Sequence, residues 1–128
     1  MVVDSSALVS ILLKEPKYEL LFEKAMSAEV TIVGAPQALE TVMAVSGRSS
    51  TDPRYLLTGL LRTIGAEIVP LTEEHYEAAV SAFLRYGKGR HPAGLNFGDC
   101  MSYAFARVSG MPLLYIGDDF SKTDIQSA

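Results

Sequence analysis

The chain opens with Met1-Val2-Val3-Asp4-Ser5-Ser6-Ala7-Leu8-Val9, and this stretch indicates the fold class. A short apolar run that ends at an acid is typical of a buried strand, and Leu8, Ile11 and Leu12 then recur at helical spacing. Pro16 interrupts this helix, and a second helical segment is predicted over residues 17–28. A strand that leads into helices is the repeating unit of an α/β sheet.

The same alternation continues along the rest of the chain. Residues 30–33, 67–70 and 112–116 predict further strands. Helices are predicted over residues 36–47, 53–65, 73–86 and 98–109, with a glycine-rich loop at residues 87–97. This order predicts a single α/β domain, residues 1–128, with a parallel sheet of four or five strands and helices on both faces.

Composition and charge limit the possible classes of protein. The 128 residues are 48% hydrophobic and 20% charged, an ordinary globular balance that excludes disordered and collagen-like chains. The net charge of −4 argues against a protein that coats DNA regardless of sequence. Cys100 is the one cysteine, so an internal disulfide is excluded. With no secretory leader and no apolar run of about 20 residues, we expect a cytoplasmic protein that does not enter a membrane.

Acidic residues follow several of the predicted strands. Asp4 ends the first strand, Glu40 lies one turn into the helix after the second, and Asp99 opens the helix after the glycine-rich loop. Asp118 and Asp119 follow the last strand. Ligands of parallel sheets bind beyond the carboxyl ends of the strands. Because crowded carboxylates repel one another, we expect a cation among them, and oxygen ligands suit Mg²⁺ or Mn²⁺.

Each acid also has a structural interpretation when it is taken alone. Asp4 is a suitable N-cap for the first helix, and Glu40 suits a solvated helix face. Asp99 suits the positive end of a helix, and Asp118 and Asp119 suit a turn. The joint placement of these acids favours a metal site that performs phosphoryl-transfer chemistry, in which the metal activates a water.

Three segments carry a resemblance to a known family. They are residues 1–9, residues 86–100 (YGKGRHPAGLNFGDC) and residues 113–125 (LLYIGDDFSKTDI). The chain resembles PIN-domain ribonucleases and, more narrowly, the VapC toxins of bacterial type II toxin–antitoxin modules, over nearly its whole length. This resemblance implies a PIN fold, Mg²⁺-dependent endonuclease activity on RNA with Mn²⁺ as a substitute metal, and inhibition by a VapB-type antitoxin. It also implies a homodimer or a toxin–antitoxin hetero-oligomer.

The resemblance assigns the catalytic and metal-binding acids. It places the first three of the family on Asp4, Glu40 and Asp99. Most members carry Thr-x-Asp after the last strand, whereas this chain has Ile116-Gly117-Asp118-Asp119. We expect Asp118 to be the fourth acid, with Asp119 as the alternative.

Two further positions match supporting residues of the family. Ser6 matches a hydroxyl that holds the first acid or a metal-bound water. Asn96 matches a residue that orients Asp99 or the substrate. Both residues lie within three positions of an acid that the resemblance assigns.

The predicted loop and its flanks are basic, with Arg85, Lys88, Arg90 and His91 in a stretch that has no acid. We expect these residues to bind RNA phosphates, since Lys and Arg contacts release counterions. The alternative is a solvated loop with incidental charge. Near the same loop, Phe97 is expected in the core, while Tyr86 and Tyr103 suit either the core or stacking on unpaired bases.

Two of the predicted helices carry apolar stripes. Leu39, Val42, Met43 and Ser46 fall on one stripe of a predicted amphipathic helix. A second stripe, Leu56, Leu57, Leu60 and Leu61, is broader than one core face needs. We expect part of this second surface to bind a partner, although a thick internal core explains it nearly as well.

Three other functions are compatible with an α/β chain of this length. A phosphoacceptor receiver domain requires paired acids after the first strand, but serines follow Asp4. A small Mg²⁺ phosphatase with an aspartyl nucleophile usually has a second acid two residues later, where this chain has Ser6. A non-catalytic PIN-like module that binds nucleic acid or protein is the third alternative.

Overall fold

The computed structural model describes residues 1–128, and all of the predicted strands and helices are present. In chain order they are β1 (Val2–Val3), α1 (Ser5–Leu13), α2 (Tyr18–Ser27), β2 (Thr31–Gly34), α3 (Ala35–Val45), α4 (Pro53–Thr63), β3 (Ala66–Val69), α5 (Glu73–Tyr86), α6 (Phe97–Ser109) and β4 (Leu113–Leu114), followed by a short 3₁₀ helix at Phe120–Lys122. The first and last strands are shorter than predicted. No helix is both long enough and apolar enough to cross a membrane.

The sheet is parallel, as predicted, with four strands in the order β3-β2-β1-β4. The chain therefore adds strands on one side of β1 and then returns to add β4 on the other side. Ligands of such sheets bind at the carboxyl ends of the strands where the winding direction changes. In this chain that point lies between β1 and β4, and Asp4 follows β1 directly. The fold thus places Asp4 at the expected binding edge.

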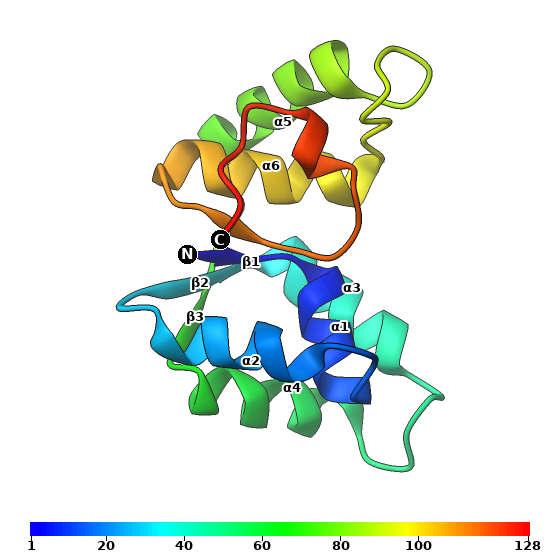
Figure 1. The fold of residues 1–128 in the computed structure, drawn as a ribbon, viewed down its shortest axis with the longest axis vertical. Coiled ribbons are helices and arrows are strands. Elements are labelled where there is room, and N and C mark those ends of the chain that lie inside the picture. The colour runs from blue at the N-terminus through cyan, green and yellow to red at the C-terminus, as the bar shows by residue number, and fades with distance from the viewer.

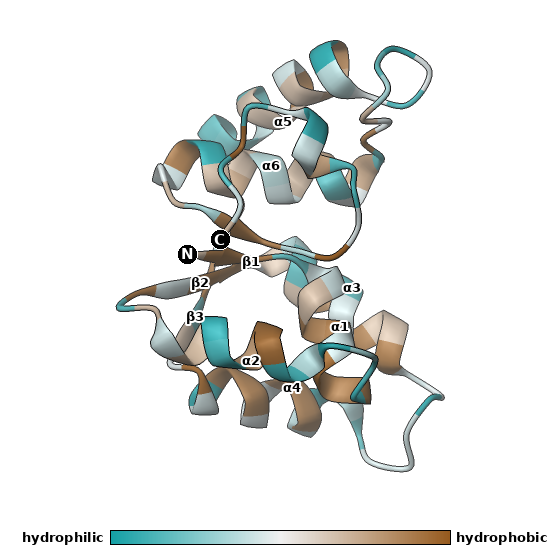
Figure 2. Ribbon diagram, in the orientation of Figure 1, coloured by the Kyte–Doolittle hydropathy of each residue, from teal (hydrophilic) through white to brown (hydrophobic).

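Helices cover both faces of the sheet, as predicted (Figure 1). Side chains alternate along a strand, so Val2 belongs to a core beneath α5 and α6, while Val3 belongs to a second core with α1 and α4. Leu113 and Leu114 divide between the same two cores. β1 and β4 are among the most hydrophobic parts of the chain (Figure 2), as strands buried on both faces must be.

Most of the apolar stripe of α3 faces outward, and only Val42 of this stripe packs against the second core. Leu39 and Met43 are 62% and 68% exposed, while the buried face of α3 carries Gln37, Ala38, Thr41 and Val45. The buried hydroxyl of Thr41 donates to the backbone carbonyl of Gln37 at 2.7 Å, which satisfies it inside the helix. Helical periodicity identifies a stripe, but it does not determine which side of the helix packs.

The leucine stripe of α4 has the opposite outcome, because Leu57, Leu60 and Leu61 are all buried in the second core. Of the two explanations offered for this stripe, the structure therefore favours a thick internal core, although Leu56 is only partly buried. The expectation for Phe97 is wrong: its side chain is 78% exposed at the start of α6. Tyr86 and Tyr103 are buried, which favours core packing over base stacking.

Candidate active site

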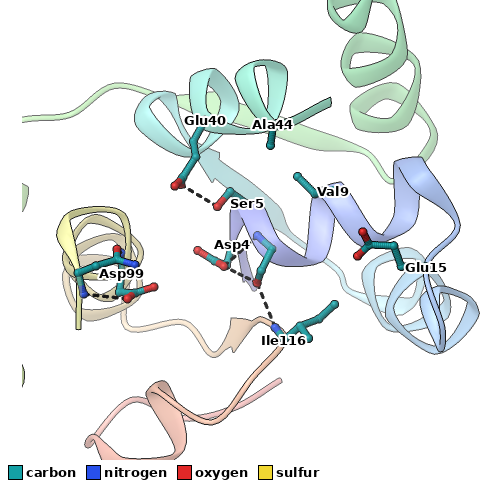
Figure 3. A pocket seen from close by; sticks show the side chains of 10 residues that line it. Asp4, Ser5, Val9, Glu15, Glu40, Ala44, Asp99 and Ile116 are labelled. Carbon is teal, nitrogen blue, oxygen red and sulfur yellow. Dashed lines mark hydrogen bonds between the residues drawn. The ribbon is translucent and has the colours of Figure 1, made fainter. Parts of the chain in front are cut away.

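An acidic cavity of about 350 Å³ lies at the carboxyl end of β1 (Figure 3). The structure brings Asp4, Glu40 and Asp99 together along its wall, from three separate elements of the chain. Glu15 also lines the cavity and is paired with Arg48 at 3.2 Å. No lysine, arginine or histidine side chain lines it. The cavity therefore concentrates negative charge without a basic side chain in its wall.

Asp4 is held in place by three donors although it is almost fully buried, at 5% exposure. It is the N-cap of α1, and its Oδ2 accepts hydrogen bonds from the backbone N–H and the hydroxyl of Ser6, at 3.0 and 2.5 Å. Its Oδ1 accepts a hydrogen bond from the buried hydroxyl of Ser102 on α6. All three donors are neutral, so they orient the carboxylate without compensating its charge.

Glu40 lies between the segments that carry the other two acids. The hydroxyl of Ser5, the neighbour of Asp4, donates to Oε2 of Glu40 at 2.7 Å (Figure 3). On the other side, a Cβ atom at Gly98 would lie only 2.9 Å from Oε1 of Glu40. The carboxylate therefore packs directly against the first turn of α6, one residue before Asp99. Gly98 has no side chain to fill this space.

Asp99 is part of the N-terminal cap of α6. Its Oδ2 accepts from the backbone N–H of Asn96 at 2.8 Å, and Oδ1 of Asn96 accepts from the N–H of Asp99 at 3.0 Å. Burial raises the pKa of the Asp99 carboxyl, although the hydrogen bond from Asn96 opposes this rise. The charges of Asp4, Asp119 and Glu40 raise the pKa further. Asp99 therefore caps a helix and also belongs to the cluster of mutually repelling carboxylates.

The two acids after β4 are exposed and lie outside the wall of the cavity. The charge of Asp119 contributes to the raised pKa of the Asp99 carboxyl. The backbone carbonyl of Asp118 instead accepts a hydrogen bond from the hydroxyl of Ser121 at 2.5 Å. The start of this turn is tied to the site, because the N–H of Ile116 donates to the hydroxyl of Ser6 at 3.1 Å.

The four predicted RNA-binding residues do not line the acidic cavity. Lys88 and Arg90 are exposed, and the guanidinium of Arg90 lies 5.2 Å from the ring centre of Phe83. The Arg85 guanidinium is paired with Asp124 at 3.3 Å. His91 is half-buried, and its Nδ1 accepts from the N–H of Ala93 at 3.1 Å. The structure therefore leaves Lys88 and Arg90 as exposed cations of this stretch that form no ion pair.

Three residues of the site are absent from the sequence-based predictions. Ser102 lies three positions after Asp99, and helical spacing alone would place both on one face of α6. Ser5 and Gly98 are each adjacent to an assigned acid, but nothing in their own sequence context indicates contact with Glu40. That contact depends on how α1, α3 and α6 pack together.

The donor set of the cavity suits a hard divalent cation. Every acid in its wall offers oxygen, and no sulfur or imidazole ligand is present, which favours Mg²⁺ or Mn²⁺ over Zn²⁺. Nowhere in the structure are three His, Cys, Asp or Glu side chains close enough together to hold a metal ion among them. Mg²⁺ commonly uses one or two carboxylates and completes its shell with waters and phosphates. Two carboxylates from this wall would therefore be enough as protein ligands.

We expect Asp99→Asn to stabilise the metal-free protein at neutral pH. A carboxyl whose pKa is raised by folding contributes stability below its unfolded pKa and loses that contribution as the pH rises through its folded pKa. Removing the charge should raise the Tm in EDTA by about 2–8 °C, and this gain should vanish below about pH 4. The amide oxygen retains the cap.

The matched control is Asp52→Asn at the N-terminus of α4. Hydrogen bonds from Arg54 lower the pKa of Asp52, so this substitution should lower the Tm at neutral pH. Thermal melts of both variants across pH would check the two signs. A destabilised Asp99→Asn at neutral pH would show that the cluster does not repel Asp99.

Nearly the whole chain is similar to one protein family. The family described as "PIN domain" matches residues 1–126. The chain is 40% identical to "Ribonuclease VapC36" of Mycobacterium tuberculosis over 127 residues, covering 98% of this chain and 91% of that protein. It is 42% identical over 125 residues to "Ribonuclease VapC" of Mycolicibacterium smegmatis, with 98% and 97% covered.

A solved structure has the same fold. It is the crystal structure of Mycobacterium tuberculosis VapC20, described as a toxin that cleaves the sarcin–ricin loop. The TM-score is 0.78 with 99% of this chain and 97% of that chain covered, at 15% sequence identity. At this level of identity the likeness concerns the fold alone.

Proposed function

Since this chain belongs to the PIN-domain family, within the VapC ribonucleases, we propose that it is an endoribonuclease that hydrolyses RNA with the help of Mg²⁺. The observation that carries this proposal is the cavity whose wall includes Asp4, Glu40 and Asp99 and no basic side chain. Carboxylates that lie close together repel one another and so bring no evident gain in stability. A divalent cation, in contrast, needs such carboxylates as ligands.

The residues in and around the cavity have different proposed roles. We assign metal binding to Asp4 and Asp99, with Glu40 and the acid of the turn, Asp119 or Asp118, completing or orienting the set. When bound, the metal supplies water activation and charge neutralisation at the scissile phosphate. Ser6 and Ser102 hold both oxygens of Asp4, while Ser5 holds Glu40. Asn96 keeps Asp99 at the start of α6.

Of the two acids in the turn, Asp119 has more support as the fourth acid. Its charge reaches Asp99, and a like-charge interaction of this kind falls off with distance. Asp119→Asn should therefore reduce hydrolysis more than Asp118→Asn does. Equal rates of RNA hydrolysis for the two variants would show that Asp119 is not a better candidate for the fourth acid than Asp118.

The ends of the cleaved RNA test the proposed reaction. Attack by water on the phosphorus, with departure of the 3′ oxygen, leaves a 5′-phosphate and a 3′-hydroxyl. The experiment treats total cellular RNA with the purified protein and Mg²⁺ and then determines the chemistry of the new ends. Cyclic 2′,3′-phosphate ends would mean that the ribose hydroxyl attacks, and the proposed reaction would then be wrong. Absence of cleavage would favour a non-catalytic PIN-like binding module.

Lys88 and Arg90 are proposed to bind the RNA backbone beside the cavity. Their loop leads directly into Asn96 and α6, and both side chains are exposed. For the double alanine variant we expect the salt dependence of RNA affinity to weaken by roughly 1.4 in the log–log slope, about 0.7 for each lost phosphate contact.

Fluorescence anisotropy in EDTA measures this slope on intact RNA. Arg62→Ala is the control, because Arg62 is an exposed cation on α4, on the opposite side of the sheet (Figure 1). A double variant with the slope of the original protein would assign Lys88 and Arg90 to the solvated surface.

Family membership supports a VapB-type antitoxin as the inhibitor and a homodimer as the assembly. The surface that suits a second copy lies around Phe97, where two apolar hollows meet. Exposed side chains there include Leu39 and Met43 of α3 and Tyr76 and Phe83 of α5. Exposed apolar areas of this kind mark protein interfaces. Light scattering at micromolar concentration should give twice the monomer mass, and Phe97→Asp should restore the monomer.

A further inference from the structure

We propose that Asp124 is a positioning residue that fixes the acidic turn Gly117–Asp119 in place and so sets the fourth carboxylate of the site. This inference rests on the proposed function, since it concerns the same cavity. Asp124 lies in the C-terminal segment, after the 3₁₀ helix, and it is not part of the wall of the cavity. Its effect must therefore be transmitted through the segment that it anchors.

Asp124 contacts three different side chains, all of them on α5 or α6. Its Oδ1 accepts a hydrogen bond from the hydroxyl of Tyr103 at 2.7 Å. Its Oδ2 lies 3.3 Å from the guanidinium of Arg85 and 3.9 Å from that of Arg107. Two of the four ion pairs in the chain therefore end on this one side chain. These contacts fasten the C-terminal segment onto α5 and α6.

The acidic turn has fixed points on both sides. Before it, the N–H of Ile116 donates to the hydroxyl of Ser6. After it, Phe120 is buried, and its ring lies 4.9 Å from that of Tyr115. The hydroxyl of Thr123 donates to the carbonyl of Phe120 at 2.8 Å, which joins this fixed point to Asp124. Only the three residues of the turn stay exposed between these points, and Gly117 has a positive φ of 105°.

Helix α6 connects this anchor to the other acids. Ser102 and Tyr103 are neighbours on α6: the first donates to Asp4 and the second to Asp124. Asp99 lies one turn earlier on the same helix. One rigid element thus positions the first acid, the third acid and the C-terminal anchor. When the anchor is lost, the turn is released relative to α6, and the fourth carboxylate moves relative to Asp99.

Mn²⁺ binding to the RNA-free protein tests this role without requiring activity. Electron paramagnetic resonance counts free Mn²⁺ and yields a dissociation constant. We expect Asp124→Ala and Tyr103→Phe to raise this constant about tenfold, the lower end of the range for groups that orient a metal ligand. Asp124→Asn should recover part of the loss, because its amide oxygen still accepts from Tyr103. In cleavage assays the Mg²⁺ concentration for half-maximal rate should rise in parallel.

Two controls separate the possible outcomes. Arg54→Ala breaks the ion pair with Asp52 at the start of α4, neither of which lines the cavity, and should leave Mn²⁺ affinity unchanged. Tyr103→Phe removes a single hydroxyl, so it decides the question if Asp124→Ala does not fold. If Tyr103→Phe leaves the Mn²⁺ affinity unchanged while Asp4→Asn abolishes Mn²⁺ binding, the positioning role of Asp124 is wrong and the proposed function stands. Absence of Mn²⁺ binding by the original protein would overturn the proposed function as well.

Discussion

Asp4→Asn is expected to reduce RNA hydrolysis by roughly a hundred- to a thousandfold, the range seen when one group that stabilises transition-state charge is removed. Asp4 is buried at the bottom of the acidic cavity, and its charge has only neutral hydrogen-bond partners. The variant keeps the shape of the side chain but loses the negative charge that a cation needs. A single-turnover assay with saturating RNA and Mg²⁺ measures the effect on the chemical step.

The fold should survive this substitution, because asparagine is as good an N-cap as aspartate. The chain offers a matched control in Asp52, the N-cap of α4, whose carboxylate accepts from the N–H of Arg54 at 2.9 Å. Asp52→Asn changes the same group at another helix start and should leave hydrolysis unchanged. If both variants cleave RNA at the original rate, Asp4 serves only as a cap.

Gly98→Ala should reduce hydrolysis by about 10- to 100-fold, comparable with the loss of a group that orients a metal ligand. The added methyl would lie 2.9 Å from Oε1 and 3.0 Å from Oε2 of Glu40, which is closer than atoms can pack. The carboxylate is the far end of a flexible side chain, so we expect it to move away while the backbone stays in place. The activity should therefore fall without a large loss of stability.

Gly59→Ala is the control for this substitution. Gly59 is also in a helix, and a Cβ atom there would meet nothing within 4 Å. The change should stabilise the protein by about 1 kcal/mol through helix propensity and leave hydrolysis unchanged. Comparing rate and Tm for the two variants separates displacement of Glu40 from a general effect of alanine. Full activity in Gly98→Ala would show that the position of Glu40 does not matter for the reaction.

Much of the fold could be predicted because local signals agree with it. Val2 and Val3 form a strand that is apolar on both faces, and a strand of this kind requires helices on either side. Pro16 lies between α1 and α2, as expected. Once the sheet is parallel, the residues after each strand share one edge. That geometry is the reason Asp4 and Glu40 could be expected near each other from sequence alone.

An acid of this chain can both cap a helix and line the acidic cavity. Asp4 caps α1 and Asp99 caps α6, yet both line the same cavity. The positive end of a helix stabilises a carboxylate, so each helix offsets part of the repulsion within the cluster. The pKa of Asp99 is raised nonetheless, because burial and the neighbouring carboxylates outweigh the hydrogen bond from the Asn96 N–H.

The remaining features depend on packing that periodicity does not encode. Leu39 and Met43 form an apolar stripe, but the orientation of α3 turns that stripe outward. Phe97 looks like a core residue in sequence, and its position at the first turn of α6 exposes it. The assignment of the fourth acid depends on the path of the turn after β4, which the C-terminal contacts determine.

The central claim is that the cavity of Asp4, Glu40 and Asp99 holds a divalent cation. A crystal structure of the protein soaked in Mn²⁺, with anomalous data collected at the manganese edge, tests it most directly. We expect an anomalous peak inside this cavity, within ligand distance of carboxylate oxygens of Asp4 and Asp99. Manganese found only elsewhere, with these carboxylates still turned to their serine and asparagine partners, would contradict the claim.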